Sequence, residues 1–265
     1  MSTKSYWADK DQKKEQARIH TAKMEQFFKK EIEECVKKTK VYDDAEVYKC
    51  NKGFLNNQEL ITESYKKPGI IIEDIDSVSA ILKYAKEKTT VLNFASYKEP
   101  GGMFLQGSTA QEECLCHQSF LYNVLSKKQN YYEYNKKSLN KALYTNRALY
   151  SPDVIFGKGN KIVKCDVITC AAPNFSTASK YQSVSRADNN LVLKSRIDFV
   201  LAIAALNQVS TLILGAYGCG VFGQNPVDVA SIFKDKINQY PFELVIFAIP
   251  KSANGNLDAF NLVFQ

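Results

Sequence analysis

Residues 211–250, TLILGAYGCGVFGQNPVDVASIFKDKINQYPFELVIFAIP, decide the fold because they hold two apolar runs on either side of a longer segment with charged residues. The runs 211–216 and 243–250 predict buried strands, and residues 226–239 between them predict a helix. Apolar strands that alternate with helices are typical of a parallel sheet covered by helices on both faces. We therefore expect an α/β protein.

The same alternation extends back along the chain. It predicts strands over 41–50, 90–96, 153–156 and 165–172, and helices over 77–88, 110–128 and 189–208. The polar, tyrosine-rich segment 129–146 predicts an excursion from the core, not a domain boundary. We expect residues 1–265 to form one three-layer α/β/α domain with a mostly parallel mixed central sheet, and a charged amphipathic helix over 1–40 packed on the core.

Composition places the chain among globular proteins. Its 265 residues are 45% hydrophobic and 24% charged, which excludes a disordered tail or a collagen-like fibre. The longest apolar run, 199–206, is too short to cross a bilayer, and the charged start of the chain does not resemble a signal peptide. The seven cysteines form no CxxC pair, so we expect reduced thiols and a cytoplasmic location, with the nucleus as an alternative in a eukaryote.

Histidine content limits the chemistry. His20 and His117 are the two histidines of the chain, and His20 is expected on a solvated helix surface. Two distant histidines disfavour a histidine-rich metal site and a Ser-His-Asp apparatus. Carboxylates are therefore the candidates for proton transfer. The net charge of +7 allows an anionic partner without identifying it.

A glycine-rich loop follows the strand 211–216. Asn225 and Pro226 suit the N-cap and the first position of the next helix, so backbone amides and a helix N-terminus converge as in a phosphate cradle. Gly218, Gly220 and Gly223 spell GxGxxG, but the motif lies in the last strand–helix–strand unit, which disfavours a dinucleotide fingerprint and a nicotinamide-dependent oxidoreductase. A tight turn that needs glycine is the other interpretation.

A second glycine loop precedes a pair of acidic residues. Gly101 and Gly102 would let a ligand approach the backbone, and Glu112 and Glu113 begin the next predicted helix. Glu112 also fits a capping box with Thr109. Consecutive helical residues point about 100° apart, so the glutamates cannot oppose each other across a bond as glycosidase carboxylates do. One would position a hydroxyl while the other transfers a proton, and a general acid here would need burial to keep its proton.

These segments resemble a known family. The stretch 93–122, NFASYKEPGGMFLQGSTAQEECLCHQSFLY, resembles the signature of poly(ADP-ribose) glycohydrolases, in which a glycine triplet precedes Gln-Glu-Glu. The stretches YSPDVIF (150–156), DVITCAAPN (166–174) and LILGAYGCGVFGQNP (212–226) resemble the compact microbial branch. The similarity covers nearly the whole chain. It implies a macrodomain-like fold and cleavage of ribose–ribose O-glycosidic bonds in poly(ADP-ribose), with release of ADP-ribose and without metal or cofactor.

The resemblance also assigns roles to residues. It makes Glu113 the general acid and base at an oxocarbenium-like centre, while Glu112 holds hydroxyls of the leaving ribose. Asn93 would orient the distal ribose, and Phe222 would pack on a ribose. The implied substrate-binding residues are Asn93, Gly101, Gly102, Met103, Gln111, Gly218, Cys219, Gly220, Val221 and Phe222. The implied partners are poly(ADP-ribose) or ADP-ribosylated proteins, with no DNA sequence recognition, no membrane and a monomeric chain.

The sequence departs from the family pattern at two positions. Met103 stands in place of the third glycine, where its side chain and restricted backbone could reshape the loop, and Ser96 falls where animal enzymes have asparagine. A hydrolase of mono-ADP-ribosylated proteins and a non-enzymatic ADP-ribose-binding macrodomain are therefore alternatives. Cys114, Cys116 and His117 predict core or surface positions, not a metal site, and Cys219 predicts a small packed residue in preference to a nucleophile.

Overall fold

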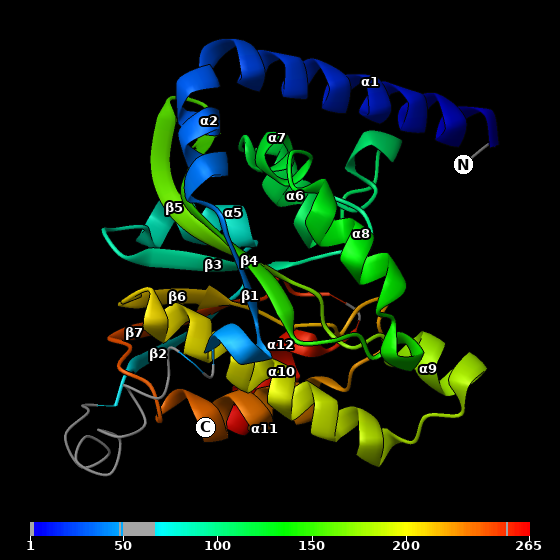
Figure 1. Ribbon diagram of the computed structural model, residues 1–265, viewed down its shortest axis with the longest axis vertical. Helices are drawn as coiled ribbons and strands as arrows, with labels where there is room; N and C mark the ends of the chain where they lie inside the picture. The colour runs from blue at the N-terminus through cyan, green and yellow to red at the C-terminus, as the bar shows by residue number, and fades with distance from the viewer. Residues whose placement is uncertain (1–2, 48, 50–66, 253) are drawn as a thin grey trace.

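The computed structural model describes residues 3–47, 49, 67–252 and 254–265 (Figure 1). In this part of the chain seven strands form one sheet in the order β1-β4-β5-β3-β6-β7-β2. The strands are β1 (Lys40–Asp43), β2 (Gly69–Glu73), β3 (Thr89–Phe94), β4 (Arg147–Lys158), β5 (Lys161–Cys170), β6 (Thr211–Leu214) and β7 (Leu244–Ala248). The pairs β5–β3, β3–β6, β6–β7 and β7–β2 are parallel, and β1–β4 and β4–β5 are antiparallel. The predicted mixed, mostly parallel sheet is confirmed.

Two hydrophobic cores lie on the two faces of the sheet. Successive strand residues point to opposite faces, so Leu92 packs in one core and Val91 in the other. The first core contains side chains of α10 (Arg186–Leu206), α11 (Pro226–Ile237) and α12 (Asn256–Phe264). The second contains side chains of α2 (Lys29–Lys38), α5 (Ser77–Tyr84), α6 (Gln111–His117) and α7 (Leu121–Leu125). Figure 1 shows α6 and α7 on one side of the sheet and α10 and α11 on the other, which confirms the α/β/α layers.

Local capping fixes where the helices begin. Asn225 precedes α11, and its side chain accepts hydrogen bonds from the amides of Val227 and Asp228, with Pro226 at the first helical position as predicted. The Asp76 side chain caps α5 and the Ser185 side chain caps α10 in the same way. These caps satisfy amides that have no acceptor within their own helix.

The N-terminal segment forms two helices where one was expected. They are α1 (Thr3–Phe27) and α2, and Phe28 leaves helical geometry between them at φ −126°. Ala17 and Ile32 are buried in the second core, and α1 crosses above α6 and α7 in Figure 1. His20, expected to be solvated, is half-buried with its Nε2 2.8 Å from the carbonyl oxygen of Ser119. That expectation is corrected.

The predicted helix 110–128 is also divided, into α6 and α7. The Ser119 hydroxyl donates to the Leu115 carbonyl, and the amide of Gly157 in β4 donates to the carbonyl of Gln118. The backbone between the two helices thus pairs with strand β4, where Ser119 also forms an isolated antiparallel bridge with Phe156. The segment 129–146 contains α8 (Gln129–Lys137) and a short 3-10 turn at Asn140–Ala142. Another short 3-10 turn, at Phe104–Gln106, lies in the loop before α6.

Strand boundaries differ from the sequence patterns. The predicted strand 41–50 is β1 followed by a helical turn from residue 44, and residues 48 and 50 lie outside the described part of the chain. The predicted strand 153–156 is the far half of β4, whose register shifts between Ser151 and Val154. The helix α9 (Phe175–Gln182) and the edge strand β2 were not predicted. In the described residues, no helix is both long and apolar enough to cross a membrane.

Candidate active site

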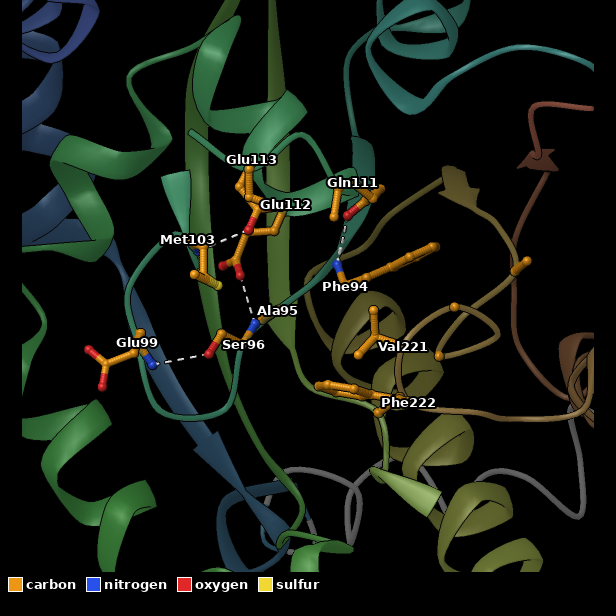
Figure 2. A pocket seen from close by; sticks show the side chains of 17 residues that line it. Phe94, Ala95, Ser96, Glu99, Met103, Gln111, Glu112, Glu113, Val221 and Phe222 are labelled. Atoms are coloured by element: carbon orange, nitrogen blue, oxygen red, sulfur yellow. Dashed lines mark hydrogen bonds between the residues drawn. The ribbon is translucent and has the colours of Figure 1, made fainter. Parts of the chain in front are cut away.

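A cleft of about 410 Å³ lies where the parallel strands end. Its walls come from the end of β3, from the loop and helix start at 102–113, and from the loop after β6. Ligands of open α/β sheets bind at this carboxyl edge. In Figure 2 the side chains of Glu112 and Glu113 belong to one wall and those of Val221 and Phe222 to another.

Glu112 is 3% exposed, and both its carboxylate oxygens are held by residues of β3 and its extension. Oε1 accepts from Nδ2 of Asn93 at 3.1 Å, and Oε2 accepts from the amide of Ser96 at 2.7 Å. The capping box predicted with Thr109 is wrong, because Ala110 is the N-cap and no side chain caps the helix. Burial raises the pKa of Glu112 to about 8; hydrogen bonds from Ser96 and Asn93 oppose this shift, and the neighbouring Glu113 adds to it. The raised pKa favours the protonated form of Glu112.

Glu113 lines the same cleft and is 5% exposed. Its Oε1 accepts from the amide of Met103 at 2.9 Å (Figure 2). Its Oε2 is buried and has no hydrogen-bond partner within the described part of the chain. A buried oxygen without a partner costs about 1–3 kcal/mol.

The glycine loop brings the two carboxylates together. Gly102 has φ +60°, and a Cβ there would lie 2.6 Å from Glu113 Oε1 and 3.0 Å from Glu112 Oε2. A Cβ at Gly101, at φ +67°, would lie 2.7 Å from the ring of Tyr122. Both positions therefore require glycine for backbone conformation and for space. The consecutive side chains leave the helix in different directions but both reach Gly102.

Met103 does not have the conformation of its two neighbours. Its φ is −105°, an ordinary value for any L-residue, so the third position of the triplet does not need glycine. The Met103 backbone is therefore unstrained, and whether it reshapes the loop relative to a glycine stays a prediction. Its side chain is 55% exposed at the rim of the cleft, where it narrows the opening.

Replacing Met103 by glycine should not relieve strain. We expect Met103→Gly to lower the free energy of unfolding by about 0.5–1 kcal/mol, because glycine has more freedom in the unfolded chain. Urea denaturation of both proteins measures the difference. A more stable variant would show that the methionine is strained in the loop.

The buried Glu112 makes stability depend on pH. Its folded-state pKa of about 8 lies above the ordinary 4.5, so the folded state binds the proton more tightly than the unfolded state. The contribution of Glu112 to stability is then fully present below about pH 4.5 and is lost as the pH rises through about 8. Glu112→Gln cannot ionise, so its stability relative to the wild type should improve by about 2 kcal/mol or more from about pH 5 to about pH 8.5.

Urea denaturation of both proteins at the two pH values measures this change. Any hydrogen bond that the amide loses contributes equally at both pH values and cancels in the comparison. A stability difference that is the same at both would show that Glu112 is ionised in the folded protein at neutral pH.

The loop after β6 forms the opposite wall. Gly218 and Gly223 have φ of +75° and +70°, and a Cβ at either would collide with Ala172 or Ser176. Gly220 has open space, Val221 is 87% exposed, and in the described residues the amides of Gly220, Val221 and Phe222 donate no hydrogen bond. Three free amides on a cleft wall suit an anionic ligand.

In the loop after β6, Cys219 is the one predicted residue that does not line the cleft, and in the first glycine loop Gly101 does not line it either. Cys219 packs against the first core, and burial raises the pKa of its thiol to about 12. The alternative of a thiol activated by loop amides is therefore wrong, and the prediction of a small packed residue is confirmed.

The side chains of Asn93 and Gln111 make hydrogen bonds within the protein at the back of the cleft. Asn93 is fully buried and donates to Glu112 and to the Thr169 hydroxyl. Gln111 borders the cleft, but its Oε1 accepts from the amide of Phe94 and its Nε2 donates to Ser77 and to the Leu92 carbonyl. Both side chains hold the start of α6 against the end of β3.

Residues beside the glutamates show no metal-binding arrangement. The Cys114 thiol donates to the Thr109 carbonyl, Cys116 is buried in the second core, and the ring of His117 packs edge-on against Phe104. Burial, with the nearby His20, lowers the pKa of His117. The described residues contain no group of three or more His, Cys, Asp or Glu side chains that could hold a metal ion.

Sequence reasoning missed part of the cleft. Phe94, Ala95, Ser108, Ala172 and Ala216 line it without having been predicted as site residues. Phe94, Ala95, Ala172 and Ala216 follow or end strands β3, β5 and β6, so their position at the carboxyl edge was the available signal. Ser96 contributes its amide to Glu112, a role that its side-chain identity does not predict.

The layered sheet and the acidic cleft at its carboxyl edge define a macrodomain-like glycohydrolase. The family of microbial-type poly(ADP-ribose) glycohydrolase (PARG) catalytic domains matches residues 10–159, which is more than half of the chain, and the chain belongs to this family. The resemblance found in the sequence is confirmed.

Solved structures agree with this assignment. Poly(ADP-ribose) glycohydrolase from Deinococcus radiodurans, in complex with ADP-ribose, is 29% identical with a TM-score of 0.75 over 88% of this chain and 97% of that chain. The enzyme from Thermomonospora curvata is 24% identical with a TM-score of 0.79, over 94% of this chain and 99% of that chain, and this likeness concerns the fold. No curated protein matches the chain.

Proposed function

We propose that this protein hydrolyses the ribose–ribose O-glycosidic bonds of poly(ADP-ribose) and releases ADP-ribose. The observation that carries the proposal is the meeting of two buried carboxylates at Gly102, in a cleft whose far wall offers free amides. The related enzyme from Deinococcus radiodurans was solved with ADP-ribose. In this chain the distal ribose would lie at the glutamates, and the diphosphate would accept hydrogen bonds from the amides of Gly220, Val221 and Phe222.

Glu113 is the proposed general acid and base. Protonated Glu113 gives its proton to the leaving ribose oxygen while the bond from that oxygen to the anomeric carbon breaks. Positive charge then develops on the ribose as an oxocarbenium-like centre. The Glu113 carboxylate next takes a proton from water as the water oxygen bonds to the anomeric carbon. The products are ADP-ribose and a polymer shortened by one unit, and the carboxyl group is restored.

Glu112 has a different proposed role, to hold hydroxyls of the leaving ribose. Its position supports this, because hydrogen bonds from Asn93 and Ser96 fix both oxygens from behind. Its raised pKa also favours the neutral form, which adds no negative charge beside Glu113 and can donate to a hydroxyl. Asn93 would then act on the ribose through Glu112, because it has no exposed surface of its own.

The direct test is release of ADP-ribose from purified poly(ADP-ribose), with calorimetric binding of ADP-ribose measured in parallel. We expect both binding and release. Binding without release would favour a non-enzymatic ADP-ribose-binding macrodomain. Release only from single units on arginine, serine or glutamate side chains would favour a mono-ADP-ribosyl-protein hydrolase, the second candidate, which the narrowing of the rim by Met103 supports.

Further properties belong to the same proposal. The six described cysteines are free, which supports a reducing cytoplasmic location. The packing of α1 and α2 on the second core supports one domain over residues 1–265. We propose a monomer that needs neither metal nor cofactor; light scattering tests the first property, and polymer hydrolysis in the presence of a chelator tests the second.

A further inference from the structure

A second hollow of about 370 Å³ adjoins the cleft on the side of the N-terminal helix. Helix α1 and the residues after the glycine loop form it together. Its walls include Asp9, Lys10, Lys13, Met103, Ser108 and Thr109. Met103 and Ser108 also line the cleft, so the two spaces share a wall. We call this second hollow the α1 groove.

Close packing fixes the α1 groove in place. Gly107 has φ +79°, and a Cβ there would lie 3.0 Å from both the Lys10 carbonyl oxygen and the Lys13 Cβ. The amide of Ser108 donates to the Met103 carbonyl, which holds the loop in a tight turn at that point. The backbone of α1 therefore lies directly against the loop that carries Met103.

The charges of the α1 groove suit an anion. Lys10 and Lys13 both line it, and the Asp9 carboxylate lies 3.0 Å from Lys13 Nζ in an exposed pair that contributes little to stability. Ser108 and Thr109 add hydroxyl groups that can donate to phosphate oxygens. A third hollow, on another side of Met103, has Glu99 as its charged lining residue; Glu99 pairs with Lys136 at 3.0 Å, and no lysine or arginine of the described residues lines this hollow.

The position of Glu113 indicates which part of a substrate reaches the α1 groove. Glu113 is bonded to the Met103 amide, so a leaving group that takes its proton begins beside Met103. In a polymer, the leaving group is the next ADP-ribose unit, and it must continue past the Met103 side chain. Of the two hollows beyond Met103, the one with the lysines matches the two negative charges of that unit's diphosphate.

Resting on the proposed function, we propose that the α1 groove is a subsite for the diphosphate of the ADP-ribose unit beyond the scissile bond. The subsite selects polymer over free ADP-ribose, which fills only the main cleft. It also gives the N-terminal helix a part in substrate recognition. Binding there is electrostatic and weakens as salt is added.

The test compares two charge reversals on the same helix. Lys13→Glu changes the α1 groove, whereas Lys14→Glu changes a lysine that pairs with Asp11 at 2.8 Å and does not line it. For Lys13→Glu we expect the KM for poly(ADP-ribose) to rise about five- to tenfold, with kcat within about twofold and ADP-ribose affinity unchanged. Lys14→Glu should leave all three values unchanged, and Asp9→Asn should lower the KM.

Each outcome decides a separate point. Equal KM values for the two reversals, or loss of ADP-ribose binding in Lys13→Glu, would overturn the subsite. So would an effect seen only with mono-ADP-ribosylated protein, since the occupant would then be a polypeptide. If the wild type neither binds ADP-ribose nor cleaves polymer, the proposed function fails instead.

Discussion

Glu113→Gln should lower the turnover of poly(ADP-ribose) by about a thousandfold while ADP-ribose still binds. Glutamine has the shape of glutamate, and its carbonyl oxygen can accept the Met103 amide that Glu113 Oε1 accepts at 2.9 Å. The loop conformation is therefore kept. The other carboxylate oxygen, which has no partner among the described residues, is replaced by an amide nitrogen that cannot transfer a proton.

The measurement is steady-state release of ADP-ribose, with calorimetric binding and thermal unfolding as controls. Binding within about threefold of the wild type and an unchanged melting temperature would show that the site is intact. Full activity in the variant would remove Glu113 from the mechanism. Low activity together with lost ADP-ribose binding would show that the substitution damages the cleft. The chemical role of Glu113 would then be tested with another substitution at this position that keeps ADP-ribose binding.

The parts of this fold that the sequence predicts are those with local causes. Asn225 and Pro226 mark the start of α11 because a cap and a fixed φ act within a few residues. The apolar runs of β6 and β7 predict buried strands because both faces of the sheet are covered. Edge strand β2 was missed; it has five residues and none of them is fully buried.

The site was predictable in its residue types but not in its contacts. The motif Thr109-Ala-Gln-Glu112 predicts a capping box by local rules, yet Glu112 turns to Asn93 and Ser96, 19 and 16 residues away. The spacing of residues in the sequence does not predict these hydrogen bonds of Glu112, because they depend on how α6 packs against the end of β3. In the same way, Met103 differs from the glycine pattern without strain because the positive φ values stop at Gly102.

Gly102→Ala should abolish most activity and also destabilise the fold, although it adds a single methyl group. That methyl would lie 2.6 Å from Glu113 Oε1 and 3.0 Å from Glu112 Oε2, so both carboxylates must move, and a displacement of about 1 Å can cost about a hundredfold in rate. The φ of +60° adds to a loss of about 1–3 kcal/mol in the free energy of unfolding. Polymer hydrolysis and urea denaturation measure the two effects.

Gly157→Ala, where a Cβ meets nothing closer than 3.6 Å, is the matched control and should change neither the rate of hydrolysis nor the free energy of unfolding. An active Gly102→Ala protein would show that the carboxylates need not meet at this glycine, and the geometry proposed for catalysis would be wrong.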